Sequence, residues 1–188
     1  MRKTWKNTIG FLSPEKATFC EHVIKEHVTE DSICLEIGTY CGKSTLHLLE
    51  HGNPKTLITI DNYTALNYET EFGTVSNPKT YTFESNQKLF KDYPQVQLIN
   101  GTTPLEINLP VLDYIYIDGG HSYQQKVADL EWVYPNCKEG TVIVLDDWDI
   151  QEVQDAIKYF CNKYSQTYVL SEPQYPQNTQ SKIVIKNT

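Results

Sequence analysis

The 188 residues of the chain suffice for one domain with a substantial core, and a second full domain would not fit comfortably. With 39% hydrophobic and 21% charged residues, the composition is that of an ordinary globular protein, which excludes the disordered and fibrous classes. The formal net charge of −8 argues against a nucleic-acid backbone or an anionic membrane as the main partner, because either would select a basic face.

A first helix is predicted to begin at Ser13-Pro14-Glu15, because Ser is a good N-cap, Pro suits the first helical position and an acid suits the first turn. Apolar residues then recur at helical spacing through residue 28. Short apolar segments and amphipathic segments alternate after that point. We predict strands at 33–37, 57–60, 96–99, 114–117 and 142–145 and helices at 43–51, 84–92, 123–133 and 150–164.

The predicted strands are continuous apolar runs, which is typical of a parallel sheet that is buried on both faces. Strands that alternate with helices predict a doubly wound, Rossmann-like α/β fold with helices on both faces of the sheet. Residues 168–170 and 183–185 have no helix between them, so we expect an antiparallel hairpin that extends the sheet edge. We interpret residues 1–188 as a single domain with an N-terminal helical segment at 1–30.

Residues 63–83 form a long, polar, tyrosine-rich segment without clear periodicity. Loops of this length inside a compact domain are usually functional or disordered. We predict a flap over the site, with a decorative surface loop as the alternative.

The start of the chain is basic, but no apolar signal-type segment follows it, and no apolar run approaches the ~20 residues of a membrane span. The five cysteines are odd in number and form no CxxC pair, so we expect reduced thiols that are mostly buried. These features together predict a cytoplasmic protein.

Acidic or polar residues stand where the predicted strands end. Since the carboxyl ends of parallel strands meet at one edge of the sheet, these residues are expected to converge where an open α/β sheet binds its ligand. In chain order they are Glu36, Asp61, Asn100-Gly101, Asp118 and Asp146-Asp147.

The glycine-containing loop after the first strand narrows the ligand class. Only three residues separate Gly38 from Gly42, whereas a P-loop needs four, and Tyr40 stands where the GxGxxG fingerprint needs its second glycine. Asp61 is placed to accept both hydroxyls of a ribose. This combination indicates a nucleoside ligand without phosphates.

The loop EIGTYCGKS, Asp61, Asp118 and Asp146-Asp147 resemble the class I S-adenosylmethionine-dependent methyltransferases. The stretches IDGGHSYQQKVADLE and VLDDW are similar to the metal-dependent O-methyltransferases of that superfamily, both the catechol and caffeoyl-coenzyme A type and the bacterial macrocin-type sugar O-methyltransferases. The resemblance covers residues 32–165 and implies S-adenosylmethionine as cofactor.

Carried over by position, the resemblance implies a cofactor site in which Glu36 supports the loop, Asp61 holds the ribose, and Gly101 lies near the adenine. The full set of implied cofactor-binding residues is Glu36, Gly38, Tyr40, Gly42, Ser44, Asp61, Asn62, Gly101, Thr102 and Asp118.

The same resemblance implies a divalent metal, usually magnesium, held by Asp118, Asp146 and Asp147. Carboxylates are hard oxygen ligands, so this set suits Mg²⁺ or Ca²⁺ on chemical grounds as well. A substrate hydroxyl at the metal would lose its proton more easily and attack the sulfonium methyl.

His121 is our candidate general base, with Asp118 as the alternative. The catechol-type enzymes carry a lysine in the loop after the first metal acid, and residues 119–123 contain none, which favours the histidine. A structural interpretation of His121 is that it caps the helix at 123. The other histidines carry little functional signal, and His51 near a helix C-terminus is explained by the helix dipole.

Three alternatives stay open: a nicotinamide-dependent oxidoreductase on the same fold, a metal-dependent hydrolase, and a non-catalytic cofactor-binding module. The absence of GxGxxG counts against the first. The expected acceptor is a small hydroxylated molecule, a sugar or a polyphenol, and a homodimer is one way to close the site. No nucleic acid or membrane partner is expected.

Overall fold

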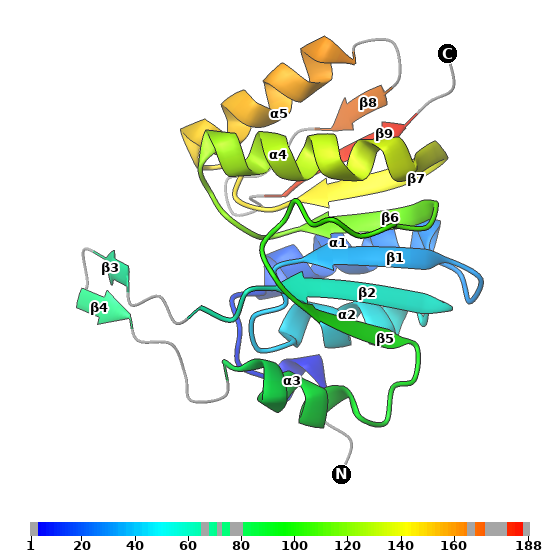
Figure 1. Ribbon diagram of the computed structural model, residues 1–188, viewed down its shortest axis with the longest axis vertical. Helices are drawn as coiled ribbons and strands as arrows, with labels where there is room; N and C mark the ends of the chain where they lie inside the picture. Colours follow the sequence, from blue (N-terminus) through cyan, green and yellow to red (C-terminus); the bar gives the residue numbers. More distant parts are fainter. Residues whose placement is uncertain are drawn as a thin grey trace.

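The computed structural model describes residues 4–64, 68–70, 73–75, 81–164, 168–171 and 180–185. Its centre is a seven-stranded sheet in the order β5-β2-β1-β6-β7-β9-β8 (Figure 1). These strands are β1 (Ile33–Ile37), β2 (Thr56–Asp61), β5 (Val96–Asn100), β6 (Leu112–Ile117), β7 (Cys137–Leu145), β8 (Tyr168–Ser171) and β9 (Ser181–Ile185). The helices are α1 (Pro14–His27), α2 (Lys43–His51), α3 (Phe83–Phe90), α4 (Tyr123–Val133) and α5 (Gln151–Lys163), with short 3-10 helices η1 (Trp5–Asn7) and η2 (Tyr134–Asn136).

The predicted fold class is confirmed. Strands β5, β2, β1, β6 and β7 are parallel, β9 runs antiparallel to β7, and β8 runs antiparallel to β9. The chain moves outward from β1 through β2 to β5 and then returns to β6 on the other side of β1. The strand order therefore reverses between β1 and β6, which is where doubly wound sheets form their ligand crevice.

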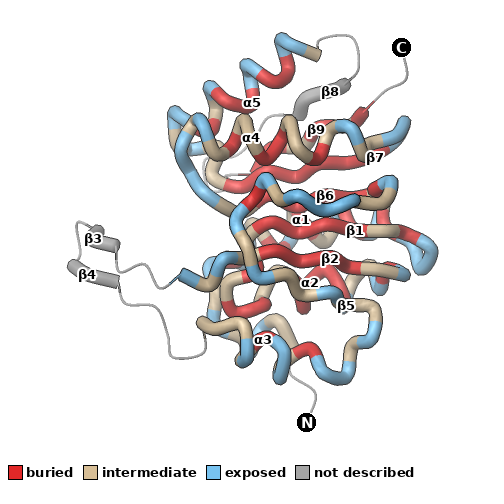
Figure 2. The backbone as a smooth tube through the Cα atoms, in the orientation of Figure 1, coloured by how far each residue is buried: buried red, intermediate tan, exposed pale blue. Residues whose placement is uncertain are grey.

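Helices cover both faces of the sheet (Figure 1). Along β6, Tyr114 and Tyr116 pack into the apolar layer that contains residues of α1, α2 and α3, whereas Ile115 and Ile117 pack into the layer that contains residues of α4 and α5. Burial on both faces explains why the strands are continuous apolar runs, and Figure 2 shows the central strands as the most buried part of the tube.

Helix α1 begins as the sequence predicts. The Ser13 hydroxyl accepts a hydrogen bond from the Lys16 amide at 3.2 Å, and Pro14 occupies the first helical position. Because the cap lies at the carboxyl edge of the sheet, the first turn of α1 brings Lys16 to that edge.

Strand β7 begins earlier than predicted. Residues 138–140 are exposed, and Gly140 has a φ of +83°, while the register with β6 shifts between Leu112 and Tyr114. An exposed, charged and irregular strand start has no apolar signal, so the sequence pattern detected only the buried segment from residue 142.

Two short strands, β3 (Tyr68–Thr70) and β4 (Gly73–Val75), pair antiparallel inside the segment predicted to be a flap. Residues 65–67, 71–72 and 76–80 lie outside the described residues, so a flap over the site stays a prediction. The five cysteines all lie within the described residues and form no disulfide bond, as expected. Among the described residues, no helix has the length and apolar character needed to cross a bilayer.

Ile115 lies in the middle of β6 with no exposed surface. Replacement by Ala should lower the free energy of unfolding by about 2–5 kcal/mol, because it removes buried methyl groups and leaves a cavity between the sheet and the layer of α4 and α5. Val111→Ala is the matched control: Val111 is 55% exposed just before the strand, and its truncation should change stability by less than about 0.5 kcal/mol. Urea denaturation measures both, and equal losses would contradict the assignment of β6 to the centre of the core.

Candidate active site

A cleft of about 880 Å³ lies at the carboxyl edge of the sheet. The loops that follow β1, β2, β5, β6 and β7 line it, together with the segment that precedes α1. Its size is that of a small-molecule site, and its place is the switch point between β1 and β6.

Most of the residues predicted for the site line this one cleft. They are Gly38, Tyr40, Ser44, Asp61, Asn62, Gly101, Thr102, Asp118, His121, Asp146 and Asp147. Two of the predicted cofactor residues do not line it. Glu36 is buried beneath the loop. Gly42, at the start of α2, faces the side chains of Leu89 and Phe90 in α3.

The loop after β1 packs its backbone directly against the end of β6. Gly38 has a φ of +99°, and a Cβ atom there would lie 2.1 Å from the carbonyl oxygen of Asp118. The Asp118 amide donates to the Ile37 carbonyl at 2.8 Å. Only glycine fits this position, so the loop is held in direct contact with Asp118 at the end of β6.

The Asp61 carboxylate is held by the residues around it. One oxygen accepts the Tyr40 amide at 2.7 Å, and the other accepts the Tyr63 amide at 2.7 Å and the Tyr81 hydroxyl at 2.8 Å. The Asn62 amide group donates to the Thr102 hydroxyl at 3.2 Å and so joins the rims of β2 and β5.

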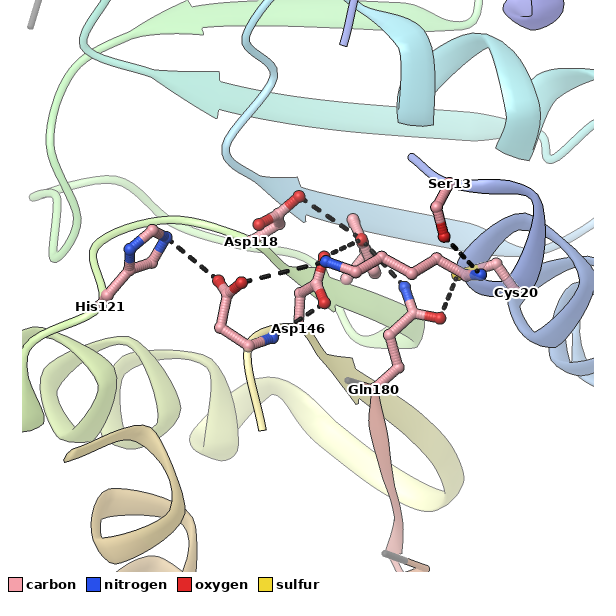
Figure 3. A network of polar contacts seen from close by, with 9 residues as sticks. Ser13, Cys20, Asp118, His121, Asp146 and Gln180 are labelled. Atoms are coloured by element: carbon pink, nitrogen blue, oxygen red, sulfur yellow. Dashed lines mark hydrogen bonds and ion pairs between the residues drawn. The ribbon is translucent and has the colours of Figure 1, made fainter. Parts of the chain in front are cut away.

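The carboxylates of Asp118, Asp146 and Asp147 lie close to His121 after the ends of β6 and β7 (Figure 3). These four residues are called the acid cluster below. One donor atom each of Asp118, His121 and Asp147 lie within 4.8 Å of one another. His121 Nε2 is 3.0 Å from Asp147 Oδ2, and the Asp147 amide donates to Asp146 Oδ1 at 2.8 Å. The cap of α4 is Ser122, whose hydroxyl accepts from the Gln125 amide at 3.3 Å, so His121 is not needed for capping.

The comparisons with known proteins agree with this geometry. Residues 35–148 match the family model described as a methyltransferase domain. The chain belongs to this methyltransferase family. It is 29% identical over 129 residues to an uncharacterized protein of Acanthamoeba polyphaga mimivirus, a match that covers 68% of this chain and 57% of that protein. The chain therefore spans little more than half the length of this curated relative.

Solved structures of methyltransferases share its class I fold. The O-methyltransferase NovP aligns with a TM-score of 0.67 at 16% identity, covering 89% of this chain and 80% of NovP. A candidate methyltransferase of Streptococcus mutans in complex with SAH aligns with a TM-score of 0.64 at 13% identity, covering 89% of this chain and 96% of that chain. At these identities the likeness shows the fold alone.

Two lysines of this methyltransferase domain reach the acid cluster, and neither was predicted. Lys16 Nζ of α1 lies 2.8 Å from Asp146 Oδ2 and 4.0 Å from Asp147 Oδ1. Lys126 of α4 is fully buried, and its ammonium makes no hydrogen bond to any described residue. Lys126 lies on the buried face of α4, where an amphipathic helix normally carries an apolar residue. This charged residue at a buried position is the one sequence feature that could have indicated its role.

Tyr116 is a third residue at the acid cluster that no sequence pattern indicated. It is buried on β6, and its hydroxyl lies 3.4 Å from Asp118 Oδ2 and 3.3 Å from Asp146 Oδ2. The Gln180 side chain donates to the same hydroxyl at 3.1 Å (Figure 3). Tyr116 thus supports two carboxylates from below the cleft.

The pKa values of Asp118 and Asp147 shift in opposite directions. Burial and the nearby charges of Asp146 and Asp147 raise the pKa of Asp118 well above its usual range, and Lys126 and Lys16 offset this only in part. Burial opposes ionisation of Asp147 too, but the His121 imidazole and the two lysines outweigh it and lower the pKa of that carboxyl.

Aromatic rings form one wall of the cleft. Tyr40 packs against Phe11 with ring centroids 5.3 Å apart and against Tyr81 at 4.8 Å. All three residues line the cleft, so a planar or sugar ligand would find a stacking surface there.

Glu36 supports the glycine loop from a site without solvent. It is 1% exposed, and its Oε2 atom accepts hydrogen bonds from the hydroxyls of Thr45 at 2.5 Å and Thr59 at 2.8 Å. Burial raises the pKa of Glu36, although these hydroxyl donors work in the opposite direction.

Gly38→Ala should disrupt the cleft, because its methyl group meets the Asp118 carbonyl and its φ is strained. Gly140→Ala is the matched control: Gly140 also has a positive φ, +83°, but a Cβ there meets nothing within 4 Å. We expect Gly140→Ala to cost about 1 kcal/mol of stability and Gly38→Ala clearly more. Thermal denaturation compares them, and similar losses would show that the contact with Asp118 is unimportant.

Glu36 should give the fold a pH dependence. Because its pKa is raised above the ordinary value of 4.5, the folded state binds this proton more tightly than the unfolded state. Its contribution to stability is therefore complete at acidic pH and is lost as the pH rises through the raised pKa. Glu36→Gln should flatten this slope at pH values above 4.5 in urea denaturation. Glu50→Gln, on the exposed side of α2, should leave the slope unchanged.

Proposed function

We propose that this chain is an S-adenosylmethionine-dependent O-methyltransferase that acts on a small hydroxylated acceptor, a sugar or a polyphenol, with help from a divalent cation. The observation that carries the proposal is that three features line one cleft: the glycine loop after β1, which suits a ligand without phosphates, Asp61, and the acid cluster. Membership of the methyltransferase family and the fold shared with NovP support it.

The adenosyl group would lie along the loops after β1, β2 and β5. Tyr40 keeps a bulky side chain where a pyrophosphate would approach, whereas Asp61 offers a carboxylate for a ribose diol. A diol there would replace the Tyr81 hydroxyl, which donates to Asp61 at 2.8 Å. The Tyr81 side chain is therefore expected to move when the cofactor binds.

The acid cluster fits a divalent cation by its chemistry. Its carboxylates are hard oxygen donors, and burial together with the nearby Asp146 and Asp147 disfavours the negative charge of Asp118, which a cation would favour. Asp118 and Asp147 would hold the cation, and Asp146 would join them if it released Lys16. A bound cation would supply positive charge that favours the deprotonated form of an acceptor hydroxyl.

The residues of the chain then account for the proton and the methyl group. If His121 donates its Nε2–H to Asp147 at 3.0 Å, its Nδ1 atom carries the lone pair that accepts the hydroxyl proton. Bound S-adenosylmethionine would supply an activated methyl group: the acceptor oxygen would bond to the methyl carbon as the carbon–sulfur bond breaks, with the electron pair left on sulfur. Asp118, whose pKa is raised, is the alternative base.

A homodimer that closes the cleft and a cytoplasmic location stay predictions. A metal-dependent hydrolase would use the same acids and His121, but it leaves Asp61 and the glycine loop without a role. A nicotinamide enzyme would need the dinucleotide fingerprint that Tyr40 interrupts.

Asp147→Asn tests the proposal most directly. The substitution keeps the shape of the side chain but removes the charge that faces the cation and orients His121. We expect S-adenosylhomocysteine to bind with nearly unchanged affinity in calorimetry, while methyl transfer to catechol and sugar acceptors falls by about 100-fold or more. Activity of the unmodified chain should rise with Mg²⁺ and fall with a chelator.

Asp149→Asn is the matched control, because Asp149 is exposed and lies only two positions away. It should leave both binding and transfer unchanged. The absence of S-adenosylhomocysteine binding to the unmodified chain, with and without Mg²⁺, would refute the cofactor assignment. Transfer that persists in Asp147→Asn would refute only the role of the metal.

A further inference from the structure

A second group of ligand-type side chains lies where α1 packs against α2, and none of its members lines the cleft. One donor atom each of Glu21, His47 and His51 lie within 4.8 Å of one another. His51 Nδ1 is 3.7 Å from Glu21 Oε1, and the two imidazole rings have centroids 4.5 Å apart. The two histidines are four positions apart on α2, so they project from the same side of the helix.

The imidazoles of this group have unused nitrogen atoms. His47 is 1% exposed, and within the described residues neither its Nε2 nor that of His51 makes a hydrogen bond. A buried polar atom without a partner carries a desolvation cost, so an unmet ligand is a natural explanation. The indole of Trp5 meets the His47 ring edge-on at 4.8 Å and shields it from the side of η1.

The protonation state of His47 suits metal binding. Burial lowers the pKa of His47 to about 4, and the neighbouring His51 lowers it further than the Glu21 carboxylate raises it. The imidazole is therefore neutral at physiological pH, which is the form that binds a metal through a ring nitrogen. Other groups near the cluster are Lys25, which pairs with Glu21 at 2.5 Å, and the aromatic ring of Trp5.

We propose that Glu21, His47 and His51 form a second metal site, selective for a borderline transition-metal cation such as Zn²⁺, that joins α1 to α2. Two imidazoles and one carboxylate are a ligand set that Zn²⁺ uses, with water in the fourth position. Tetrahedral coordination at Zn–N distances near 2.0 Å needs donor atoms roughly 3.3 Å apart. His51 Nδ1 and Glu21 Oε1 are 3.7 Å apart and both side chains are partly exposed, so small rotations of these side chains would be needed to reach that spacing.

The site would connect to the cleft through the two helices. Helix α1 carries Lys16 into the acid cluster, and the first turn of α2 carries Ser44 into the cleft. A cation between these helices would fix the two turns relative to each other. This inference is independent of the proposed function, because it concerns stability and metal content rather than transfer.

Zinc titration of the full chain tests the site. The acid cluster is first disabled by the double substitution Asp147→Asn and His121→Gln, so that binding there does not contribute. In this background we expect one Zn²⁺ per chain in calorimetry, a rise in the melting temperature on adding Zn²⁺, and a visible absorption band on replacing it with Co²⁺. His51→Gln and Glu21→Gln should each weaken binding at least about 100-fold and abolish the band.

His22→Gln is the matched control, because His22 lies on α1 with its side chain 81% exposed and outside the group. It should bind Zn²⁺ as tightly as the background chain. His47→Gln is a third test variant. If it fails to fold, the Glu21 and His51 variants, at partly exposed positions, decide the outcome. Zinc affinity that is unchanged by both His51→Gln and Glu21→Gln, or the absence of any binding in the background chain, would overturn the proposal.

Discussion

The contact between the Gly38 backbone and the Asp118 carbonyl is the constraint on which the candidate site depends. Parallel pairing places the ends of β1 and β6 side by side, and the Asp118 amide donates to the Ile37 carbonyl at 2.8 Å. Because no side chain fits between them, the loop that faces the cofactor cleft and the first acid of the cluster touch through the main chain. A displacement of either would move both, so backbone geometry would couple the proposed positions of the cofactor and the cation.

The acid cluster adds an electrostatic requirement to this geometric one. Carboxylates gathered in a partly buried place repel one another unless positive charge is near. Each helical layer supplies one lysine: Lys16 comes from α1 on one face of the sheet, and Lys126 comes from α4 on the other. The proposed cation would share this task with them. Through Lys16, the N-terminal helix thus contributes positive charge to the candidate site as well as covering the sheet.

The local pattern of the sequence carries most of the fold and much of the site. Continuous apolar runs report burial on both faces of the sheet, and turn and cap residues such as Ser13 report where helices begin. The residue after a parallel strand must lie at the carboxyl edge, so Asp61, Asp118 and Asp146 were predicted to converge from their positions alone. The glycine spacing around Tyr40 counts against phosphate-bearing cofactors for a steric reason, which also depends only on local sequence.

Only the tertiary structure decided which side chains from distant elements meet. Lys16 and Asp146 are 130 positions apart, and no periodicity links them, so their ion pair at 2.8 Å is visible only after α1 packs on the sheet. The same holds for Glu21, which meets His47 and His51 across the packing of two helices; in the sequence the dipole explained His51 and nothing singled out His47. A local sequence pattern indicates whether a residue is buried or exposed and which element it belongs to. Its contact partner in a distant element is determined by long-range packing, so no short pattern in a single sequence identifies that partner.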